Sequence, residues 1–579
     1  MKLLKLEIGD LPKEKQFRSL HAGFKVEFHK LDDKGIKAME SFSPFCFAGL
    51  NGSGKSNVLE GLASIFYHLE CCVAKFKPQT FEKHFQEKKC NPDAFTLEYL
   101  IGQPDSRTYS LENFDKITIT KTEGASPKMY KQAYPFTKEQ KRILVSLEPR
   151  FDTTFPKAAE GKIYLPDIVV GYSSGENEIL SLPFRRSRLI NFDKYREDYI
   201  KGYKYEEPEN SLIYIDSEMS QAVLLACLIY EDKETLKPLR NELGIIGLKS
   251  FRINLNVHNL SNGDNEPHPI LNHVNEKIEE LKKICTCWQE YKHDVSPVTP
   301  GLWSVITLDF FVDNAIKHAF KDCFANSFEL FRFFQVLHEL NNNIISEAIK
   351  EEIFKSRGSY TDVKFPIGNL DETVFYFIDF TLIKDIEQVG PKDLYLREFS
   401  DGEHQFLHTM GICLMLKNRR SLLLLDEPET HFNPSWRAKF IKILNDSINA
   451  GSIEEKKNLN IHLLKDILLT SHSPFIISDC MPDNVILFKR GDDGKVFPKT
   501  ARDIEFNTYG ASVDLILQEI FGMSHSISEH ALEEIKVLLR KRTVEPIIEG
   551  AKRFGESYEK GFLFERIEEL KANKKKKSK

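Results

Sequence analysis

The stretch FAGLNGSGKSN, residues 47–57, decides the fold class of this chain. It continues an apolar run, SPFCFAGL, and leads into SNVLEGLASIFYHLECCVAKF, where apolar residues recur at helical spacing. Within it, Gly49–Ser56 fits the pattern G-x-x-x-x-G-K-[ST]. Glycines let the backbone wrap around phosphates, and successive N–H groups point at them from a helix N-terminus. The stretch predicts a phosphate-binding loop rather than a chance glycine loop.

The side chains of this loop indicate a nucleoside triphosphate as the ligand, with ATP and Mg²⁺ as the expected pair. Lys55 is predicted to reach the β- and γ-phosphates as a catalytic residue, and the Ser56 hydroxyl to ligate Mg²⁺. The predicted nucleotide-binding residues are Asn51, Gly52, Ser53, Gly54, Lys55, Ser56 and Asn57.

Two later apolar runs each end in polar residues suited to nucleotide chemistry. In LLLLDEP, residues 422–428, a buried strand ends at Asp426, which is expected to hold Mg²⁺, and Glu427 is predicted to be the general base. In LLTSHSP, His472 follows another buried strand and is predicted to bind the γ-phosphate. The acidic pair alone could be a helix N-cap, and the histidine alone a structural residue. Their order after the phosphate loop favours the catalytic interpretation.

A second glycine loop, REFSDGEHQF at residues 397–406, precedes the first of these strands. Ser400 can donate a hydroxyl hydrogen bond, and Gly402 leaves its N–H accessible to an oxyanion. The helical pattern that follows makes the loop a helix N-terminus that favours a phosphate. One phosphate tail cannot use both loops if they lie far apart in one subunit, but two copies docked head-to-tail would bring them together.

Length and composition describe an ordinary cytoplasmic protein. The 579 residues predict two or three folded units, 41% are hydrophobic, and the formal net charge of −6 gives no sign of a globally basic nucleic-acid binder. No cysteine pair has zinc spacing, and neither a signal peptide nor a membrane span is expected. The tail KANKKKKSK from Lys571 is either a disordered solubilising tail or a contact to phosphates or a partner.

The predicted fold class is α/β: an ATPase head with a mixed sheet flanked by helices, a helical insertion and a small helical C-terminal extension. Residues 1–189 hold the phosphate loop and accessory strands, and residues 190–389 are expected to be a mainly helical insertion. Residues 390–495 resume the ATPase with the second glycine loop, the acidic pair and His472. Residues 496–579 form the extension with its lysine-rich tail.

The set and order of these motifs resemble the ABC-type ATPases of the SMC, RecF and OLD-like branch. The matched residues are the phosphate loop, Ser400–Glu403 as the signature, Asp426–Glu427, ETHFNP as the D-loop region, and His472. The resemblance covers roughly residues 1–185 and 390–490. It implies that Ser400, Gly402 and Glu403 contact the opposite subunit's ATP in a homodimer or higher oligomer.

The chain departs from the family pattern at two signature positions and leaves one motif open. Phe399 replaces the usual Leu, and Asp401 replaces the first signature Gly, whereas Ser400 and Gly402 are kept. The Q-loop is either at Gln103 or in the loop GYSSGENE, residues 171–178.

Segments such as VVGYSSGENEILSLPF and FNTYGASVDLILQEIFGM further resemble restriction-system-associated ATPases of bacterial antiphage systems, including the Septu-type PtuA group. This resemblance implies a slow or regulatory ATPase that controls a partner nuclease of HNH type. A reverse transcriptase with its noncoding RNA, as in retrons, or DNA, is a further expected partner. The alternatives are an SMC/RecF-like DNA-repair ATPase, which would be expected to carry long heptads or a zinc hook, and a transporter ATPase, which needs a membrane partner.

Overall fold

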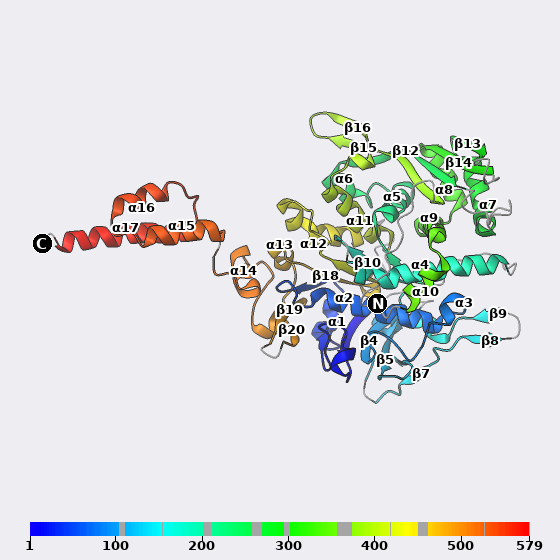
Figure 1. Ribbon diagram of the computed structural model, residues 1–579, viewed down its shortest axis with the longest axis horizontal. Helices are drawn as coiled ribbons and strands as arrows, with labels where there is room; N and C mark the ends of the chain where they lie inside the picture. The colour runs from blue at the N-terminus through cyan, green and yellow to red at the C-terminus, as the bar shows by residue number, and fades with distance from the viewer. Residues whose placement is uncertain are drawn as a thin grey trace.

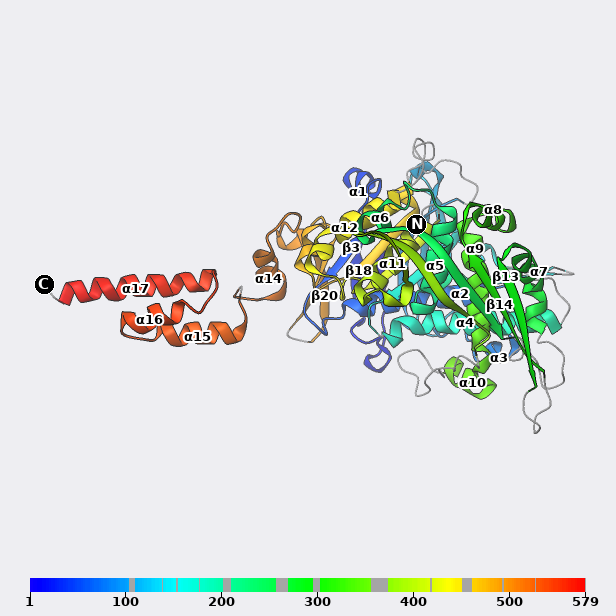
Figure 2. The same ribbon diagram turned by 90° about the horizontal axis from the view of Figure 1, so that it is seen from above.

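The computed structural model contains a head built on three main sheets and an arm of helices that extends from it (Figures 1 and 2). It describes residues 1–103, 110–137, 139–152, 155–175, 177–200, 210–256, 269–294, 302–355, 373–416, 419–449, 461–491, 494–525 and 527–577. Glu176 of the candidate Q-loop and the final two residues of the lysine-rich tail lie outside these ranges.

A seven-stranded sheet carries the predicted nucleotide motifs, in the order β11-β10-β17-β18-β3-β19-β20. All neighbouring strands are parallel except β19 and β20, which form an antiparallel hairpin. Strands β3, β17 and β18 are buried along their whole length, as their apolar sequences predict. The strand bounds are β3 Phe45–Ala48, β10 Ile168–Ser173, β11 Leu212–Tyr214, β17 Ser421–Asp426, β18 Lys465–Thr470, β19 Val485–Arg490 and β20 Val496–Thr500.

Helix α2 (Lys55–Val73) begins at the phosphate loop and is buried around most of its surface. It packs between the central sheet and a six-stranded antiparallel sheet, with Phe66 against Tyr99. The antiparallel sheet has the order β2-β1-β4-β5-β6-β7. Its bounds are β1 Lys2–Ile8, β2 Lys25–Glu27, β4 Phe95–Gly102, β5 Phe114–Lys121, β6 Lys128–Ala133 and β7 Ile143–Val145; β8 Arg150–Asp152 and β9 Phe155–Lys157 form a separate hairpin.

The other side of the central sheet is covered by helices that also contact a second antiparallel sheet (Figure 1). Helix α5 (Ser217–Tyr230) touches α9 (Ser327–Leu340), α11 (Asp401–Met415) and strands β12 and β15. The remaining helices of the head are α1 Asp33–Met39, α3 Gln79–Glu82, α4 Glu178–Ile200, α6 Lys237–Leu243, α7 Pro269–Ile284, α8 Asn314–Cys323, α10 Glu347–Lys355, α12 Pro434–Asn449 and α13 Pro474–Ser478.

The segment at residues 190–389, predicted to be mainly helical, also contains strands of two sheets that the prediction did not place. Strand β11 belongs to the central sheet, and a five-stranded antiparallel sheet has the order β13-β14-β12-β15-β16. Its bounds are β12 Ile245–Asn256, β13 Cys287–Asp294, β14 Leu302–Phe311, β15 Phe375–Ile386 and β16 Gly390–Tyr395. Apolar rings form its inner face, with Phe251 stacked on Phe310 at 4.6 Å between centroids. The helical pattern continued past the end of α7 into β13, because partner strands far along the chain override local periodicity.

The C-terminal helices leave the head and form an arm with its own small core (Figures 1 and 2). Helix α14 (Val513–Phe521) packs on α13, and α15 (Glu529–Leu539), α16 (Val544–Ala551) and α17 (Tyr558–Lys577) pack on one another. We call residues 529–577 the arm. Its buried residues are Ile535, Ile547, Ala551, Leu563 and Ile567. In the part of the chain that the structure describes, no helix is long and apolar enough to cross a membrane.

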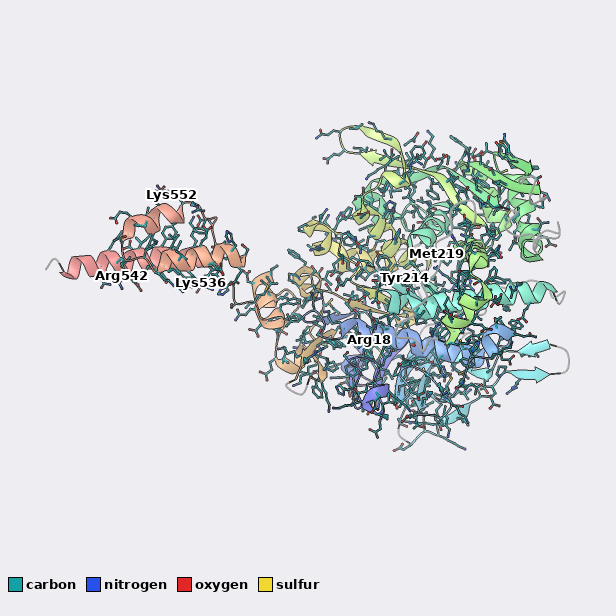
Figure 3. The ribbon with its side chains drawn as sticks, in the orientation of Figure 1. Arg18, Tyr214, Met219, Lys536, Arg542 and Lys552 are labelled. Carbon is teal, nitrogen blue, oxygen red and sulfur yellow. The ribbon has the colours of Figure 1, made fainter. Side chains whose placement is uncertain are left out.

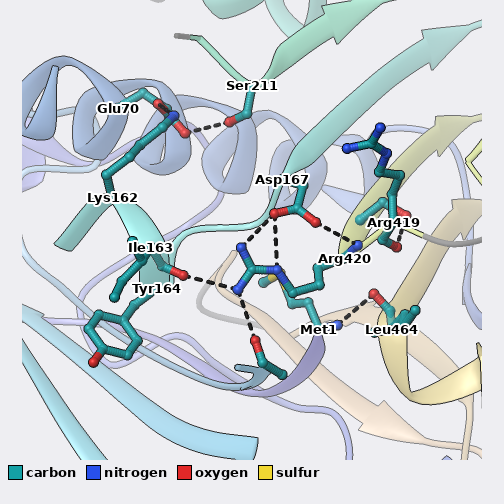
Figure 4. A network of polar contacts seen from close by, with 12 residues as sticks. Met1, Glu70, Lys162, Ile163, Tyr164, Asp167, Ser211, Arg419, Arg420 and Leu464 are labelled. Carbon is teal, nitrogen blue, oxygen red and sulfur yellow. Dashed lines mark hydrogen bonds and ion pairs between the residues drawn. The ribbon is translucent and has the colours of Figure 1, made fainter. Parts of the chain in front are cut away.

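Arg420 joins the two sheets at the edge where β17 begins (Figure 4). Its guanidinium donates to the Asp167 carboxylate, to the Gly102 carbonyl at 2.8 Å and to the Ile163 carbonyl at 3.0 Å. The Met1 amine donates to two carbonyls nearby, Leu463 and Leu464. The side chain of Arg420, the residue before β17, therefore joins the end of strand β4 to the segment before β10.

We expect Arg420→Ala to lower the free energy of unfolding by about 2 kcal/mol, because it leaves a carboxylate and two carbonyls without their charged donor. Arg419→Ala is the matched control. Arg419 only lies over the Phe328 ring, 4.2 Å from its centroid, so its loss should cost less than about 1 kcal/mol. Urea unfolding of both variants measures the difference, and equal losses would contradict the role given to Arg420.

Candidate active site

The phosphate loop Gly49–Ser56 lies between β3 and α2, as predicted, and its conformation requires glycine at defined positions. Gly54 has a φ of 96°, and a Cβ there would lie 2.2 Å from the Ser19 hydroxyl. Gly49 has a φ of 144°, and its Cβ would lie 2.7 Å from the Phe488 carbonyl oxygen. The loop is therefore enclosed by the 16–24 segment and by β19.

Several contacts hold this loop in a shape suited to phosphate. The Lys55 ammonium donates to the carbonyls of Gly49 at 3.0 Å and Leu50 at 3.1 Å, and Arg490 donates to the Gly52 carbonyl at 3.0 Å. Burial lowers the pKa of Lys55, while the carboxylates of Glu427 and Asp426 oppose that shift. Within the described chain the buried Ser53 hydroxyl has no hydrogen-bond partner. A buried hydroxyl without a partner in a ring of backbone amides fits a phosphate oxygen.

Asp426 is the centre of the site, because three elements donate to its carboxylate. Ser56 at the start of α2 and Thr470 at the end of β18 each donate to Oδ1 at 2.7 Å. Asn177 in the loop before α4 donates to Oδ2 at 2.7 Å. The Ser56 hydroxyl and the Asp426 carboxylate are adjacent hard oxygen donors, which is the ligand chemistry that Mg²⁺ prefers.

Asn177 favours one of the two alternatives for the Q-loop. Gln103 follows β4, beside the carbonyl that binds Arg420, and therefore lies at the edge of the central sheet opposite the site. The loop at residues 171–178 instead brings Asn177 onto Asp426. The side-chain oxygen Oδ1 of Asn177 also accepts a hydrogen bond from the Leu180 amide at 3.1 Å, so the start of α4 fixes this side chain.

Glu427 lies next to the phosphate loop in a strained backbone conformation, with a φ of 49°. Its amide donates to Thr470 Oγ1 at 3.0 Å, and its carboxylate lies 3.4 Å from His472 Nε2. Burial raises the pKa of Glu427, the charge of Asp426 raises it further, and Lys55 opposes both. Burial and then Lys55 lower the pKa of His472. A strained residue whose carboxyl binds protons more readily than usual is suited to general-base chemistry.

The D-loop region connects this carboxylate to neighbouring segments. Thr430 donates its hydroxyl to the Glu427 carbonyl at 3.0 Å, and the Ser174 hydroxyl donates to Thr430 at 2.8 Å. Glu429 is buried and accepts a hydrogen bond from the Ser471 hydroxyl. Burial raises the pKa of Glu429 to about 7. Glu429, the third acid of the DEPE sequence, therefore still binds its proton close to neutral pH, two residues after Glu427.

The signature segment occupies a separate place in the fold. Ser400 caps α11, and its hydroxyl and amide each donate to the Glu403 carboxylate at 2.9 Å. Glu403 also forms an ion pair with Lys384, so the cap fixes it in this subunit. Gly402 is buried, and a Cβ there would lie 2.7 Å from the His431 carbonyl oxygen. Here glycine allows close contact with the D-loop, a role that the sequence analysis did not assign to it.

The predicted residues thus fall into two groups. The phosphate loop, Asp426, Glu427 and His472 meet at the carboxyl edge of the central sheet. The polar contacts described for Ser400 lie within its own cap, and none reaches the phosphate loop. Asn51 and Gly52 are exposed, and the Asn57 amide pairs with the Ser19 hydroxyl at 2.7 Å.

The sequence analysis missed Asn177 and Thr470 as contributors to the site. Both carry a signal of the same kind as the one that found Asp426. Thr470 is the final residue of a buried apolar strand, and Asn177 follows the end of β10 within a few residues. Polar side chains at the carboxyl edge of parallel strands are candidates for a ligand site.

Comparison with known proteins supports the ATPase interpretation. Residues 303–478 match the family described as AAA domain, putative AbiEii toxin, Type IV TA system, which confirms the predicted ATPase domain. The chain is 24% identical to the Septu protein PtuA of Bacillus thuringiensis over 135 residues, in line with the predicted resemblance to Septu-type ATPases. The aligned part is 23% of this chain and 30% of that relative.

Solved structures of SMC heads are also similar to this chain. A SmcHead bound to the C-winged helix domain of ScpA has a TM-score of 0.30 and 11% identity, covering 87% of this chain and 100% of that one. An Smc head domain with an extended coiled coil from Pyrococcus furiosus, bound to the C-terminal domain of ScpA, has a TM-score of 0.30 and 10% identity, covering 87% and 98%.

We expect Glu429→Gln to remove a pH dependence of stability. The folded chain keeps the Glu429 proton to about pH 7, whereas an ordinary glutamate releases it near 4.5. This contribution to stability is therefore complete below pH 4.5 and is lost as the pH rises through 7. Gln mimics the neutral acid, so the variant should be about 2 to 3 kcal/mol more stable than wild type near pH 8, and the gap should narrow toward pH 5.

Urea unfolding at both pH values measures this gap, with the exposed residue change Glu565→Gln as the control. A gap between wild type and Glu429→Gln that stays the same at both pH values would contradict a proton held on Glu429.

Proposed function

We propose that this chain is the ATP-hydrolysing subunit of a bacterial antiviral defence complex, in which ATP-driven head-to-tail pairing of two copies regulates a partner nuclease of HNH type. One observation carries the proposal. The phosphate loop, Asp426, Glu427 and His472 form one site, while Ser400, on the same chain, caps α11 outside that site. A second copy is therefore needed to bring a signature serine to the nucleotide.

Binding of ATP rests on groups that the fold already positions. Backbone N–H groups of the loop and the N-terminus of α2 face the phosphates, and the Ser53 hydroxyl is free to donate. Lys55, held by two loop carbonyls, exchanges them for β- and γ-phosphate oxygens. Ser56 and Asp426 would hold Mg²⁺, which neutralises charge on those oxygens when it is bound.

Hydrolysis requires a water molecule to attack the γ-phosphorus as the bond to the β-phosphate oxygen breaks. Glu427 takes the proton from that water, and its raised pKa brings its proton affinity closer to neutral pH. Lys55 stabilises the negative charge that develops on the leaving ADP. His472, 3.4 Å from Glu427 and largely neutral because its pKa is lowered, donates a hydrogen bond to the γ-phosphate.

Pairing also has support in the surface around the site. Leu50 in the phosphate loop is 60% exposed, and Phe475, three residues after His472, is 36% exposed. In the proposed pair the second copy would cover these two side chains. In the paired state the exposed Ser400 hydroxyl of one copy would donate to the γ-phosphate bound by the other.

The antiviral role rests on the Septu relative and on the AbiEii-type family match. A reverse transcriptase with its noncoding RNA is the further partner that a retron-like system would add. The alternative is an SMC/RecF-like DNA-repair ATPase, which shares the same site chemistry. Neighbouring genes separate the two, since an HNH nuclease or a reverse transcriptase beside this gene supports defence.

The division of the chain into segments that end at residues 189, 389 and 495 stays a prediction.

Glu427→Gln should preserve ATP binding and lower turnover by about 10² to 10⁴-fold, because the amide cannot accept the proton of the attacking water. Steady-state phosphate release and equilibrium binding of fluorescent ATP measure the two properties. In cells that also express the neighbouring nuclease gene, plaque counts should show loss of phage protection. Wild-type turnover would exclude Glu427 as the base, and normal turnover without any phage phenotype would contradict the defence role alone.

Ser400→Arg should block pairing without weakening ATP binding to the phosphate loop. The arginine removes the hydroxyl and places a bulky side chain between the two copies. We expect turnover to fall at least tenfold, about 1.4 kcal/mol, and the ATP-dependent dimer to disappear in light scattering. Asp401→Arg, one residue along the same exposed turn, controls for added positive charge. Unchanged turnover of Ser400→Arg at low protein concentration would contradict head-to-tail pairing.

A further inference from the structure

Two segments rich in cations meet at the outer end of the arm. Residues 536–543 (KVLLRKRT) carry four Lys or Arg and no acid, and residues 570–577 (LKANKKKK) carry five lysines and no acid. The first runs from the end of α15 into the turn before α16, and the second ends α17. These two segments hold nine cations on a chain whose formal net charge is −6, and two of the nine have acidic partners, Lys536 with Glu529 at 4.0 Å and Lys571 with Glu568 at 2.8 Å.

The small core of the arm sets this arrangement. Leu538 and Leu539 at the end of α15 and Leu570 of α17 pack on the same core, and α15 and α17 are in contact. Figure 3 shows Arg542 on the part of the arm that points toward the C-terminus, with Lys536 and Lys552 closer to the head. Helix α17 continues to Lys577, so the chain stays helical into a tail that the sequence could describe as disordered.

The cations of the turn are available to a partner. Arg540, Lys541 and Arg542 are exposed, and no carboxylate of the described residues lies within ion-pair distance of them. Other cations of the arm do have acidic partners, such as Lys552 with Glu549 at 2.7 Å and Arg553 with Glu534 at 3.3 Å.

The helix dipole explains only part of this pattern. A cation in the last turn of a helix stabilises it by about 0.3 to 1 kcal/mol, and one side chain is enough for that effect. Three consecutive cations at one helix end and four consecutive lysines at another exceed this need. Uncompensated charges repel one another, so their concentration at one place is a cost that a bound polyanion would remove.

We propose that the outer end of the arm binds the phosphate backbone of a nucleic acid. Lysine and arginine side chains at an exposed turn supply charges rather than a shaped pocket, which suits a regular row of phosphates. An anionic membrane fits less well. On α17 the exposed aromatic side chains, Tyr558, Phe562 and Phe564, lie in the first two turns, away from the lysine-rich end. A membrane-surface helix places apolar side chains alongside its cations.

The test is binding of the full-length chain to fluorescein-labelled duplex DNA of about 30 base pairs and to single-stranded RNA of the same length, by anisotropy between about 50 and 200 mM salt. One variant is Arg540→Gln/Lys541→Gln/Arg542→Gln, and a second is Lys574→Gln/Lys575→Gln/Lys576→Gln/Lys577→Gln. The control is Lys34→Gln/Lys37→Gln/Lys233→Gln, which removes three exposed cations from the head.

We expect wild type and the control to bind alike, and both arm variants to bind at least tenfold more weakly at about 100 mM salt. The slope of log K against log salt should fall by about 3 for the triple variant, since each lost phosphate contact removes nearly one released counterion. Preference for DNA or RNA identifies the kind of nucleic acid.

Three results would overturn the proposal: no binding by wild type, equal affinity and slope in the arm variants and the control, or binding only to vesicles of equimolar phosphatidylserine and phosphatidylcholine. Binding needs neither ATP nor a nuclease, and ATP turnover of the arm variants is measured in parallel. Failure of this proposal therefore leaves the proposed function untouched, and the reverse also holds.

Discussion

The arrangement of the site depends on one carboxylate held at the end of a buried strand. Asp426 follows four leucines that are buried on both faces of the central sheet, so burial fixes its position. Ser56, Thr470 and Asn177 then satisfy it from three different elements, each at 2.7 Å. Because a buried carboxylate without donors is costly, these hydrogen bonds also fix the phosphate loop, the β18 end and the loop after β10 relative to one another.

The close contact between Gly402 and the D-loop connects the signature segment to Glu427, the proposed general base. The His431 carbonyl oxygen would lie 2.7 Å from a Cβ on Gly402, so the two segments are in close contact. The His431 amide also donates to Gln405 of α11 at 3.1 Å. Thr430, the preceding residue, binds the Glu427 carbonyl. In the proposed pair, a second copy that contacts Ser400 would act on the segment that connects Gly402, through His431 and Thr430, to the Glu427 carbonyl.

The sequence predicted the parts of this molecule that rest on local pattern. The phosphate loop, the strand ending at Asp426 and the strand before His472 could be predicted because apolar runs and glycines specify them locally. The five-stranded sheet was not predicted as a whole, because β12 pairs with β14 and β15 across segments remote in sequence. The contact of Asn177 with Asp426 and the burial of Gly402 against His431 join distant segments, so the sequence could make Asn177 a candidate by its place after β10 but could not show either contact.

Helix α14, which precedes the arm, makes an aromatic contact with the proposed nucleotide site. Phe521, the last residue of α14, lies 5.9 Å from the His472 ring between centroids, at 32° between the planes. Gly522 follows with a φ of 68°, and the arm begins a few residues later. Helix α14 is in turn fixed to α13, since the Gly510 amide donates to the Ser478 carbonyl at 2.8 Å. If His472 turned toward a bound γ-phosphate, as the proposed function requires, its packing against Phe521 would change.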